Sequence, residues 1–221
     1  MGLIEKFLRQ CRKPQGLLGR FIGRAMNVGH AKGRRWGLGH VSSESYVAVL
    51  DVGCGGGAAI RDMASIYPGA RLFGIDYSHD MVLLATKVNR GLMESGRIGI
   101  SQGSVSSLPF SDNTFDLVTA FEASYFWPDI DGDLQEIKRV LRPGGTLMLV
   151  NEAYENDKFR KRNRKLAAWA DIHLHSPAEY RDFLTKAGYG AIQVHEFVEK
   201  NWIAALGKKR KPPSTGKRTN H

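Results

Sequence analysis

The sequence predicts an α/β fold with a doubly wound, Rossmann-like sheet of mainly parallel strands, and three observations support this. Along residues 45–152, short and almost continuously apolar runs alternate with amphipathic helical patterns, which is typical of parallel strands covered on both faces. A glycine-rich stretch directly follows the first apolar run, where ligands bind in such sheets. Residues 191–206 alternate as two strands joined at 199–201, which predicts a hairpin at the sheet edge.

Residues 1–40 come first and are expected to form an N-terminal helical extension. One apolar stripe runs along its start, formed by Ile4, Phe7, Leu8 and Cys11. The stripe favours a helix packed on the domain, with a helix on a membrane surface as the alternative. The stretch 26–40 mixes glycines with Asn27, His30, Trp36 and His40. We expect it to be a lid over the ligand site of the domain, with a solvated arm as the alternative.

The predicted domain spans residues 41–206, with five strands before the hairpin at 45–52, 71–76, 97–103, 115–121 and 146–152. Between the last two strands, apolar residues three and four positions apart share one helix face, and Pro143-Gly144-Gly145 is predicted to end that helix. A further helix begins after Ser176, which forms a capping box with Glu179. Gly188 ends it.

The basic charge lies at the two ends of the chain. The net charge is +10, of which residues 1–40 contribute +8 and residues 207–221 contribute +6, so the domain between them is mildly acidic. We expect residues 207–221 to be a disordered tail, which solubilises the protein or weakly anchors nucleic acid or anionic lipid. The chain starts without a long apolar run and has two cysteines, so we expect no signal peptide, no membrane span and a reducing, cytoplasmic location.

The stretch DVGCGGG, residues 51–57, predicts a ligand at the end of the first strand. Gly53 and Gly55 would let the backbone approach that ligand, and Gly57 would turn the chain into the next helix. Exposed N–H groups at the helix start would favour an anionic ligand group. The spacing fits both the G-x-G-x-x-A pattern of dinucleotide sites and the D-x-G-x-G-x-G pattern of S-adenosylmethionine sites.

Two aspartates help to distinguish these ligands. Asp51 would repel a pyrophosphate and attract a cationic amino group. Asp76 ends the second strand and is placed to accept both ribose hydroxyls of either ligand, although a helix N-cap is the alternative. Tyr77 follows and offers a flat face for an adenine ring.

Four stretches stand in order across residues 45–152: VLDVGCGGG, LFGIDYS, GSVSSLPFSDNTFDLVTAF and EIKRVLRPGGTLMLVNE. Together they resemble the class I S-adenosylmethionine-dependent methyltransferases, of the methyltransferase type 11 kind that is related to ubiquinone and menaquinone biosynthesis. LPFSDNTFDLV and LRPGG do not belong to NAD-binding domains, so the resemblance implies S-adenosylmethionine as the cofactor. It also implies a seven-stranded sheet whose last strand runs antiparallel.

The resemblance further implies which residues bind the cofactor. Those around its methionine part and ribose would be Asp51, Gly53, Cys54, Gly55 and Asp76, and those around its adenine would be Tyr77, Ser104 and Val105. The family often has an acid where this chain has Ser104, and a hydroxyl accepts a hydrogen bond more weakly than a carboxylate does. Adenine recognition would therefore rely more on the backbone at Val105.

The stretch FEASYFWPDI follows the fourth strand, where the resemblance implies residues that face the transferred methyl group. We assign Phe121 to the cofactor side and Glu122 and Tyr125 to catalysis on the acceptor side. Glu122 would bind a cationic or hydroxyl-bearing acceptor or act as a base, with a structural contact to the glycine loop or the ligand as the alternative. Tyr125 and Trp127 would form an aromatic wall, unless they only pack in the core.

Two further features stay open. His173 and His175 have the spacing of a metal-binding pair, but no third ligand is evident, so no metal is expected. Residues 157–169 carry six Lys and Arg residues, either as a solvated helix face or as an attraction for an anionic acceptor or nucleic acid.

We therefore predict an S-adenosylmethionine-dependent methyltransferase that acts on a small-molecule acceptor through an O, N, S or C atom. An RNA methyltransferase that uses the basic ends is the alternative, although the sequence has no N/D-P-P-Y/F/W stretch and no RNA-binding module. A non-enzymatic adenosine-ligand binder and an NAD-dependent oxidoreductase are weaker alternatives. The sequence leaves the oligomeric state open.

Overall fold

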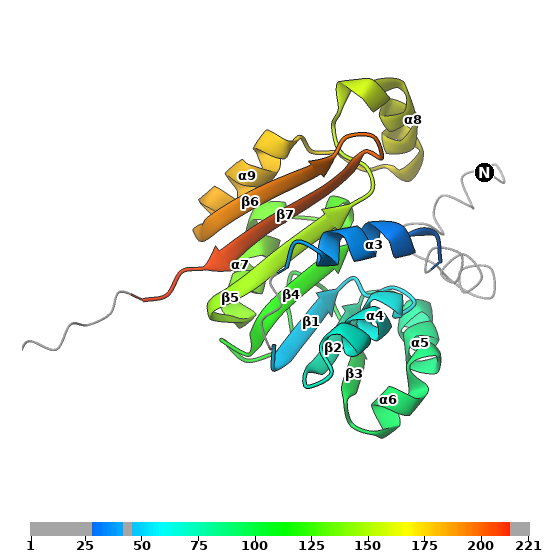
Figure 1. Cartoon of the computed structure of the whole chain (residues 1–221), viewed down its shortest axis with the longest axis vertical. Helices are drawn as coiled ribbons and strands as arrows, with labels where there is room; N and C mark the ends of the chain where they lie inside the picture. Colours follow the sequence, from blue (N-terminus) through cyan, green and yellow to red (C-terminus); the bar gives the residue numbers. More distant parts are fainter. Residues whose placement is uncertain (1–27, 42–45, 213–221) are drawn as a thin grey trace, which may run out of the picture.

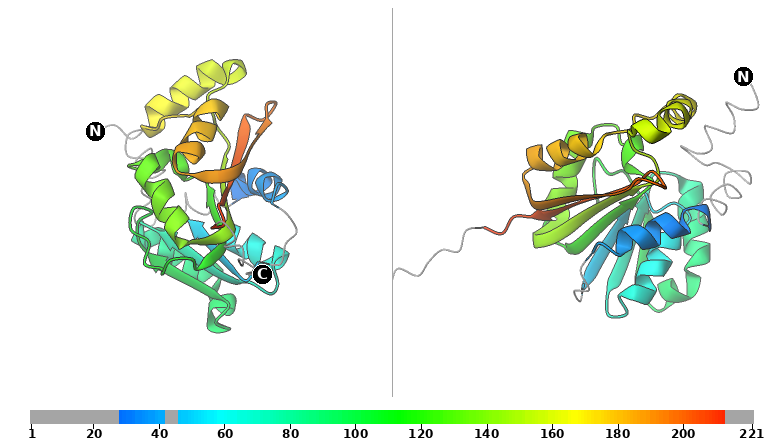
Figure 2. Two further views of the ribbon diagram at one scale, coloured as in Figure 1. Left: turned by 90° about the vertical axis from the view of Figure 1, so that its left-hand side faces the viewer. Right: turned by 45° about the horizontal axis from the view of Figure 1, so that its top comes forward.

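The structure, a computed structural model, describes residues 28–41 and 46–212. These residues form a seven-stranded sheet in the order β3-β2-β1-β4-β5-β7-β6, in which β7 runs antiparallel to both of its neighbours. Helices cover both faces of the sheet (Figures 1 and 2). The predicted doubly wound α/β fold with an antiparallel last strand is confirmed.

The strands are β1 (Ala48–Val52), β2 (Arg71–Asp76), β3 (Ile98–Gln102), β4 (Phe115–Phe121), β5 (Leu141–Asn151), β6 (Tyr189–Phe197) and β7 (Trp202–Lys209). The helices are α3 (Ala31–Leu38), α4 (Ala58–Ile66), α5 (His79–Val88), α6 (Arg90–Glu94), α7 (Ile130–Val140), α8 (Arg160–Ala170) and α9 (Pro177–Lys186). Short 3-10 turns lie at Ser124–Phe126 and Asp157–Phe159. All five strands predicted before the hairpin are present, and the hairpin forms β6 and β7.

Two boundaries differ from the sequence-based expectation. Helix α7 ends at Val140, and residues 141–145 begin β5, because Leu141 pairs with Phe115 of β4 before a register shift. Strand β7 continues to Lys209, so residues 207–209, which charge alone assigned to the tail, belong to the sheet. The Lys209 ammonium donates to the carbonyl oxygen of Leu141 at 2.8 Å, which gives this charged strand end a partner.

The sheet is buried on both faces, as its apolar strands predict. Neighbouring residues of β1 point to opposite sides. Leu50 packs in the cluster that includes Leu134 of α7, whereas Val49 packs in the cluster that includes Ile60 of α4. Each of these four side chains is fully buried.

The order of the sheet reverses between β1 and β4, and the helices of the first two crossovers, α4 to α6, lie on one face of the sheet while α7 lies on the other. A doubly wound sheet binds its ligand at this switch point, beyond the carboxyl ends of the strands. The glycine loop follows β1 here, and Gly57, with φ of 77°, is the N-cap of α4. Gly57 therefore turns the chain into the helix as predicted.

Helix α3 lies against β5 and β7 on the same face as α4 (Figure 1). It approaches closely because Gly33 and Gly37 are one helical turn apart on the side that faces β5. A Cβ atom on Gly33 would lie 2.2 Å from Oε1 of Glu152, and one on Gly37 would lie 2.5 Å from Cγ2 of Val150. The two glycines thus let the N-terminal segment reach the end of β5.

We expect Gly37→Ala to lower the free energy of unfolding by about 1–3 kcal/mol, because Val150 is buried and cannot move aside for a methyl group. This corresponds to a drop in Tm of roughly 3–10 °C, measured by thermal unfolding. Gly91→Ala in α6 is the matched control, since a Cβ there would meet nothing within 4 Å. Equal melting temperatures for the two variants would contradict the close approach of α3.

No helix within residues 28–41 and 46–212 is long and apolar enough to cross a membrane. The predicted stripe of Ile4, Phe7, Leu8 and Cys11, the side chain of Asn27 and residues 213–221 of the tail lie outside the described residues.

Candidate functional site

A cavity of about 370 Å³ opens beyond the carboxyl ends of β1, β2 and β4, at the switch point of the sheet. It is lined by all nine residues that the sequence assigned to the cofactor: Asp51, Gly53, Cys54, Gly55, Asp76, Tyr77, Ser104, Val105 and Phe121. Such a size is typical of small-molecule sites. The structure thus brings the assigned residues together, and the role of each one stays a prediction.

The glycine loop uses its N–H groups within the protein. Gly53 and Gly55 have positive φ angles of 74° and 51°, which fold the chain back on β2. The N–H groups of Gly53 and Cys54 both donate to the carbonyl oxygen of Ile75, at 2.8 and 3.0 Å, and that of Gly55 donates to the Asp76 carboxylate at 2.8 Å. These three N–H groups are therefore not available to an anion, whereas the expectation for the N–H groups at the start of α4 stays a prediction.

Asp51 places a buried carboxylate next to this loop. It is 1% exposed, and its Oδ1 accepts a hydrogen bond of 2.7 Å from the Thr119 hydroxyl. Burial raises the pKa of Asp51 to about 7, although Thr119 and the nearby Arg34 oppose the shift. The guanidinium of Arg34 is engaged with Asp62 at 3.0 Å. A cationic ligand group would stabilise the ionised form of Asp51.

Asp76 organises the loop and keeps capacity for a ligand. Its Oδ2 accepts from the Gly55 N–H group and its Oδ1 from the Ser78 N–H group, both at 2.8 Å. Burial raises its pKa in spite of these two bonds. A carboxylate has about four lone-pair positions, so two stay free for ribose hydroxyls. The N-cap of α5 is Ser78 and not Asp76, so the helix-cap alternative for Asp76 is wrong, and its ribose role stays a prediction.

The predicted adenine side is more open. Tyr77 is 40% exposed, whereas Val105 is buried. The Ser104 hydroxyl accepts a hydrogen bond of 3.2 Å from the N–H group of Ser106. Part of its acceptor capacity is therefore used within the protein, and the role of the Val105 backbone in adenine recognition stays a prediction.

Glu122 has an unusual backbone and a buried carboxylate. Its φ of 54° is a left-handed conformation that non-glycine residues rarely adopt and that is common at functional sites. Its Oε1 accepts from the N–H group of Glu152, and its Oε2 accepts from the Tyr125 hydroxyl, both at 2.5 Å. Burial raises its pKa. The structural contact of Glu122 is thus made with the end of β5 and not with the glycine loop.

The aromatic wall differs in one residue from the predicted one. Trp127 lines the cavity, and so does its neighbour Phe126. Tyr125 is not among the cavity-lining residues of the described chain, and it reaches the site through its hydrogen bond to Glu122. Trp127 also packs against the core, so this side chain both lines the cavity and contributes to core packing.

The N-terminal segment contributes His30 and Arg34 to the cavity. Nδ1 of His30 lies 3.4 Å from Oε2 of Glu152 and 4.0 Å from Oε2 of Glu122. Burial lowers the pKa of His30, but the two carboxylates raise it by more than burial lowers it. The net pKa of His30 therefore lies above its usual value. His30, Glu122 and Glu152 therefore form one charged cluster beside the cofactor cavity, which we call the acceptor cluster.

Trp36 and His40, which the sequence placed in the same lid, lie elsewhere. The Trp36 ring packs against Phe197 and Trp202 of the β6–β7 hairpin, with centroid distances of 6.2 and 6.0 Å. His40 stacks on His195 at 4.1 Å. They anchor α3 to the sheet, while His30 and Arg34 reach the cavity.

Arg34, Phe126 and Glu152 were not singled out from the sequence. Glu152 follows β5 directly, as Asp76 ends β2, so the rule that strand ends carry functional side chains would have found it. Arg34 gave no such signal, because it is one of nine basic residues in 1–40.

Comparison with known proteins agrees with this architecture. Residues 50–149 match the family model of the methyltransferase domain. A sterol 24-C-methyltransferase of Gibberella zeae is 35% identical over 130 residues, which cover 57% of this chain and 33% of that enzyme. The chain therefore spans about a third of the length of that relative.

Two solved structures share the fold over nearly the whole chain. A methyltransferase of Haloferax volcanii, solved in complex with the Trm112 methyltransferase activator, has a TM-score of 0.73 and 22% identity, and covers 95% of this chain and 99% of that one. Phosphoethanolamine N-methyltransferase 2 of Haemonchus contortus has a TM-score of 0.77 and 14% identity, and covers 96% of this chain and 61% of that one. Residues 50–149 thus match a methyltransferase domain, in agreement with the resemblance to the class I S-adenosylmethionine-dependent methyltransferases that the sequence predicts.

Proposed function

We propose that this chain is an S-adenosylmethionine-dependent methyltransferase that transfers a methyl group to a small-molecule acceptor. One observation carries the proposal. The cavity at the switch point combines the buried Asp51 carboxylate with a glycine loop whose N–H groups are already bonded within the protein. Such a surface suits the cationic amino acid end of S-adenosylmethionine better than the pyrophosphate of a dinucleotide.

The residues present fit this cofactor. Asp51 would hold the amino group, Asp76 the ribose hydroxyls, and Tyr77, Ser104 and Val105 would surround the adenine. Phe121 and Trp127 would exclude water from the reacting centre. When bound, the cofactor supplies an electrophilic methyl group on a sulfonium, so the protein mainly has to align and desolvate the acceptor.

The acceptor cluster is the second half of the proposed site. Glu122 and His30 line the cavity beside the cofactor residues, and Glu152 holds His30 from the β5 end. Two carboxylates beside aromatic side chains suit an acceptor that carries an amine or a hydroxyl on an apolar body. Glu122 would accept the proton of this group, since burial raises its pKa, and Tyr125 would orient Glu122.

Relatives support a small acceptor over a nucleic acid. The curated relatives are named for sterols, and one solved structure holds phosphomonomethylethanolamine with S-adenosylhomocysteine. The six basic residues of 157–169 lie on the turn before α8 and on α8, which extends away from the sheet (Figure 1). We therefore rank an RNA acceptor second. A cytoplasmic location is part of the proposal, because Cys54 is a buried free thiol.

Calorimetric titration tests the cofactor. We expect S-adenosylhomocysteine to bind the purified full chain with one site, and NAD to give no heat under the same conditions. Tight NAD binding without a response to S-adenosylhomocysteine would overturn the proposal. A screen of metabolite fractions and total RNA with S-adenosylmethionine labelled in its methyl group would then identify the acceptor class, and label in RNA alone would favour the alternative.

A further inference from the structure

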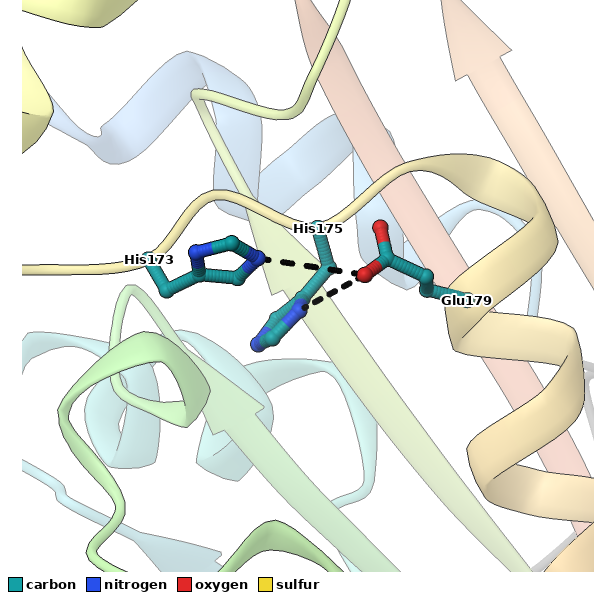
Figure 3. Close-up of side chains that lie close together, drawn as sticks. All are labelled: His173, His175 and Glu179. Atoms are coloured by element: carbon teal, nitrogen blue, oxygen red, sulfur yellow. Dashed lines mark ion pairs between the residues drawn. The ribbon is translucent and has the colours of Figure 1, made fainter.

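Three side chains outside the proposed active site converge between α8 and α9. His173 and His175 lie in the irregular segment 171–176, and Glu179 lies in the first turn of α9 (Figure 3). The sequence showed the two histidines as a possible pair without a third ligand, and the structure supplies that ligand. None of the three lines the cofactor cavity.

The distances are close to those of a metal centre. Nε2 of His173 and Nδ1 of His175 each lie 3.8 Å from Oε1 of Glu179, and the three atoms all lie within 4.8 Å of one another. In a tetrahedral zinc site with bonds of about 2.1 Å, ligand atoms are about 3.4 Å apart. Each nitrogen would have to move closer to the Glu179 oxygen by well under one ångström, and the two nitrogens closer to each other by about one ångström at most, for all three atoms to bind one ion.

The carboxylate is already oriented. Oε2 of Glu179 accepts hydrogen bonds from the N–H group and the hydroxyl of Ser176, at 2.7 and 2.8 Å, in the capping box of α9. Oε1 is left to face the two imidazoles. Outer hydrogen bonds of this kind commonly fix the ligating oxygen of a metal-binding carboxylate.

His175 gives an independent indication of a ligand. Its Nδ1 is buried and has no hydrogen-bond partner within the described residues, although it points towards Glu179 (Figure 3). The His175 ring is 13% exposed and packs edge-on against Phe183, with a centroid distance of 4.9 Å. A buried polar atom without a partner is costly, and a metal ion would satisfy it.

We propose that Nε2 of His173, Nδ1 of His175 and Oε1 of Glu179 bind one Zn²⁺ ion, with water in the remaining position. Two histidines and one carboxylate are a common zinc ligand set, and the two imidazole nitrogens favour Zn²⁺ over Mg²⁺ and Ca²⁺, which prefer oxygen ligands. The ion joins segment 171–176 to α9. The site lies outside the cofactor cavity, so we assign the ion no step of methyl transfer.

The acceptor cluster is a second group of histidine and carboxylates, so the test must separate the two. In the acceptor cluster both oxygens of Glu122 already accept hydrogen bonds, from the Glu152 N–H group and from Tyr125. At the proposed zinc site, the alternative to a metal ion is a pair of ion pairs, in which both histidines are protonated and bind Glu179 directly.

The experiment is titration of the metal-stripped full chain with ZnCl2 by calorimetry, in parallel with MgCl2. We expect one zinc site, no magnesium binding, and a rise in Tm of about 5 °C or more at saturating zinc. The double variant H173A/H175A should bind zinc at least 100-fold more weakly and lose the rise in Tm. E179Q keeps a side chain that can cap α9 and should still weaken zinc binding by tenfold or more.

His30→Ala is the matched control, because it removes the histidine of the acceptor cluster and leaves the proposed ligands intact. It should bind zinc as the unmodified chain does. Cobalt in place of zinc should give the visible absorption of a tetrahedral ion, which ion pairs cannot give. Absence of zinc binding, unchanged binding in H173A/H175A, or loss of binding in H30A would each overturn the proposal, and none of these results bears on the proposed methyltransferase function.

Discussion

The Asp51→Asn variant is expected to bind S-adenosylhomocysteine roughly 10- to 100-fold more weakly than the unmodified chain at pH 8. The reason is the loss of a charge-assisted hydrogen bond, which is worth about 1.5–3 kcal/mol. Asparagine keeps the size of the side chain and can still accept the hydrogen bond from Thr119. Calorimetric titration measures the difference directly.

The pH dependence gives this prediction a second readout. Burial raises the pKa of Asp51 to about 7, so the Asp51 carboxyl group of the ligand-free chain is protonated below pH 7. A cationic ligand group selects the ionised carboxylate, and below pH 7 its binding must therefore release a proton. The affinity of the unmodified chain should fall by nearly tenfold per pH unit below 7, and that of Asp51→Asn should stay much flatter.

The same substitution should have the opposite effect on stability. The folded chain holds the Asp51 proton up to about pH 7, whereas the ordinary pKa is 3.8, so this group loses stabilising free energy as the pH rises between these values. The loss amounts to roughly 4 kcal/mol at most. We expect ligand-free Asp51→Asn to melt at a higher temperature than the unmodified chain at pH 8.

Asp116→Asn is the matched control for Asp51→Asn. Asp116 lies at the start of β4, and its Oδ2 accepts hydrogen bonds from the N–H groups of Val47 and Ala48, near the opposite end of β1. It should leave ligand affinity and its pH dependence unchanged. If Asp51→Asn both melted at a lower temperature and kept its ligand affinity, Asp51 would serve the fold and not the cofactor.

The Glu122→Gln variant is expected to transfer methyl groups at least about 100-fold more slowly than the unmodified chain, because a positioned base contributes at least that factor to the rate. Glutamine can still accept the hydrogen bond from the Glu152 N–H group, so the fold and the affinity for S-adenosylhomocysteine should be retained. The rate is measured with the acceptor found in the labelled-methyl screen, and cofactor affinity is measured by calorimetry.

Two comparisons make the Glu122 prediction specific. Tyr125→Phe removes only the hydroxyl that donates to Glu122 and should slow the reaction less than Glu122→Gln does. In ligand-free protein, the pKa of His30 should decrease in Glu122→Gln, because the Glu122 carboxylate is one of the groups that raise it. NMR titration of the imidazole measures this without any acceptor. An unchanged methyl-transfer rate in Glu122→Gln would rule out a base at this position.

Much of the fold was predictable because it depends on local patterns. The apolar strands 71–76 and 115–121 coincide with β2 and β4, and the Ser176–Glu179 capping box begins α9 as expected. The errors lie where pairing between strands decides. Residues 207–209 read as a charged tail, yet they complete β7, because the sheet supplies carbonyl partners for Lys209 that composition cannot show.

The candidate site was predictable to the extent that it follows strand ends. Asp51, Asp76 and Glu122 each lie in or next to the last residues of a strand, so the switch-point rule places them at one edge of the sheet. The contribution of His30 was not predictable as a contact, since it depends on how closely α3 packs on β5 through Gly33 and Gly37.

The sequence by itself determined the α/β fold and predicted the ligand site at the strand ends, because hydrophobic period, glycine spacing and strand-end acids are local properties of the chain. The resemblance of four stretches to methyltransferases added the kind of ligand to expect. Only the tertiary structure decided where the N–H groups of the glycine loop are used and which side chains join Glu122. The physical reason is that hydrogen bonds and charge clusters form between residues far apart in sequence, and their partners are fixed only when the layers pack.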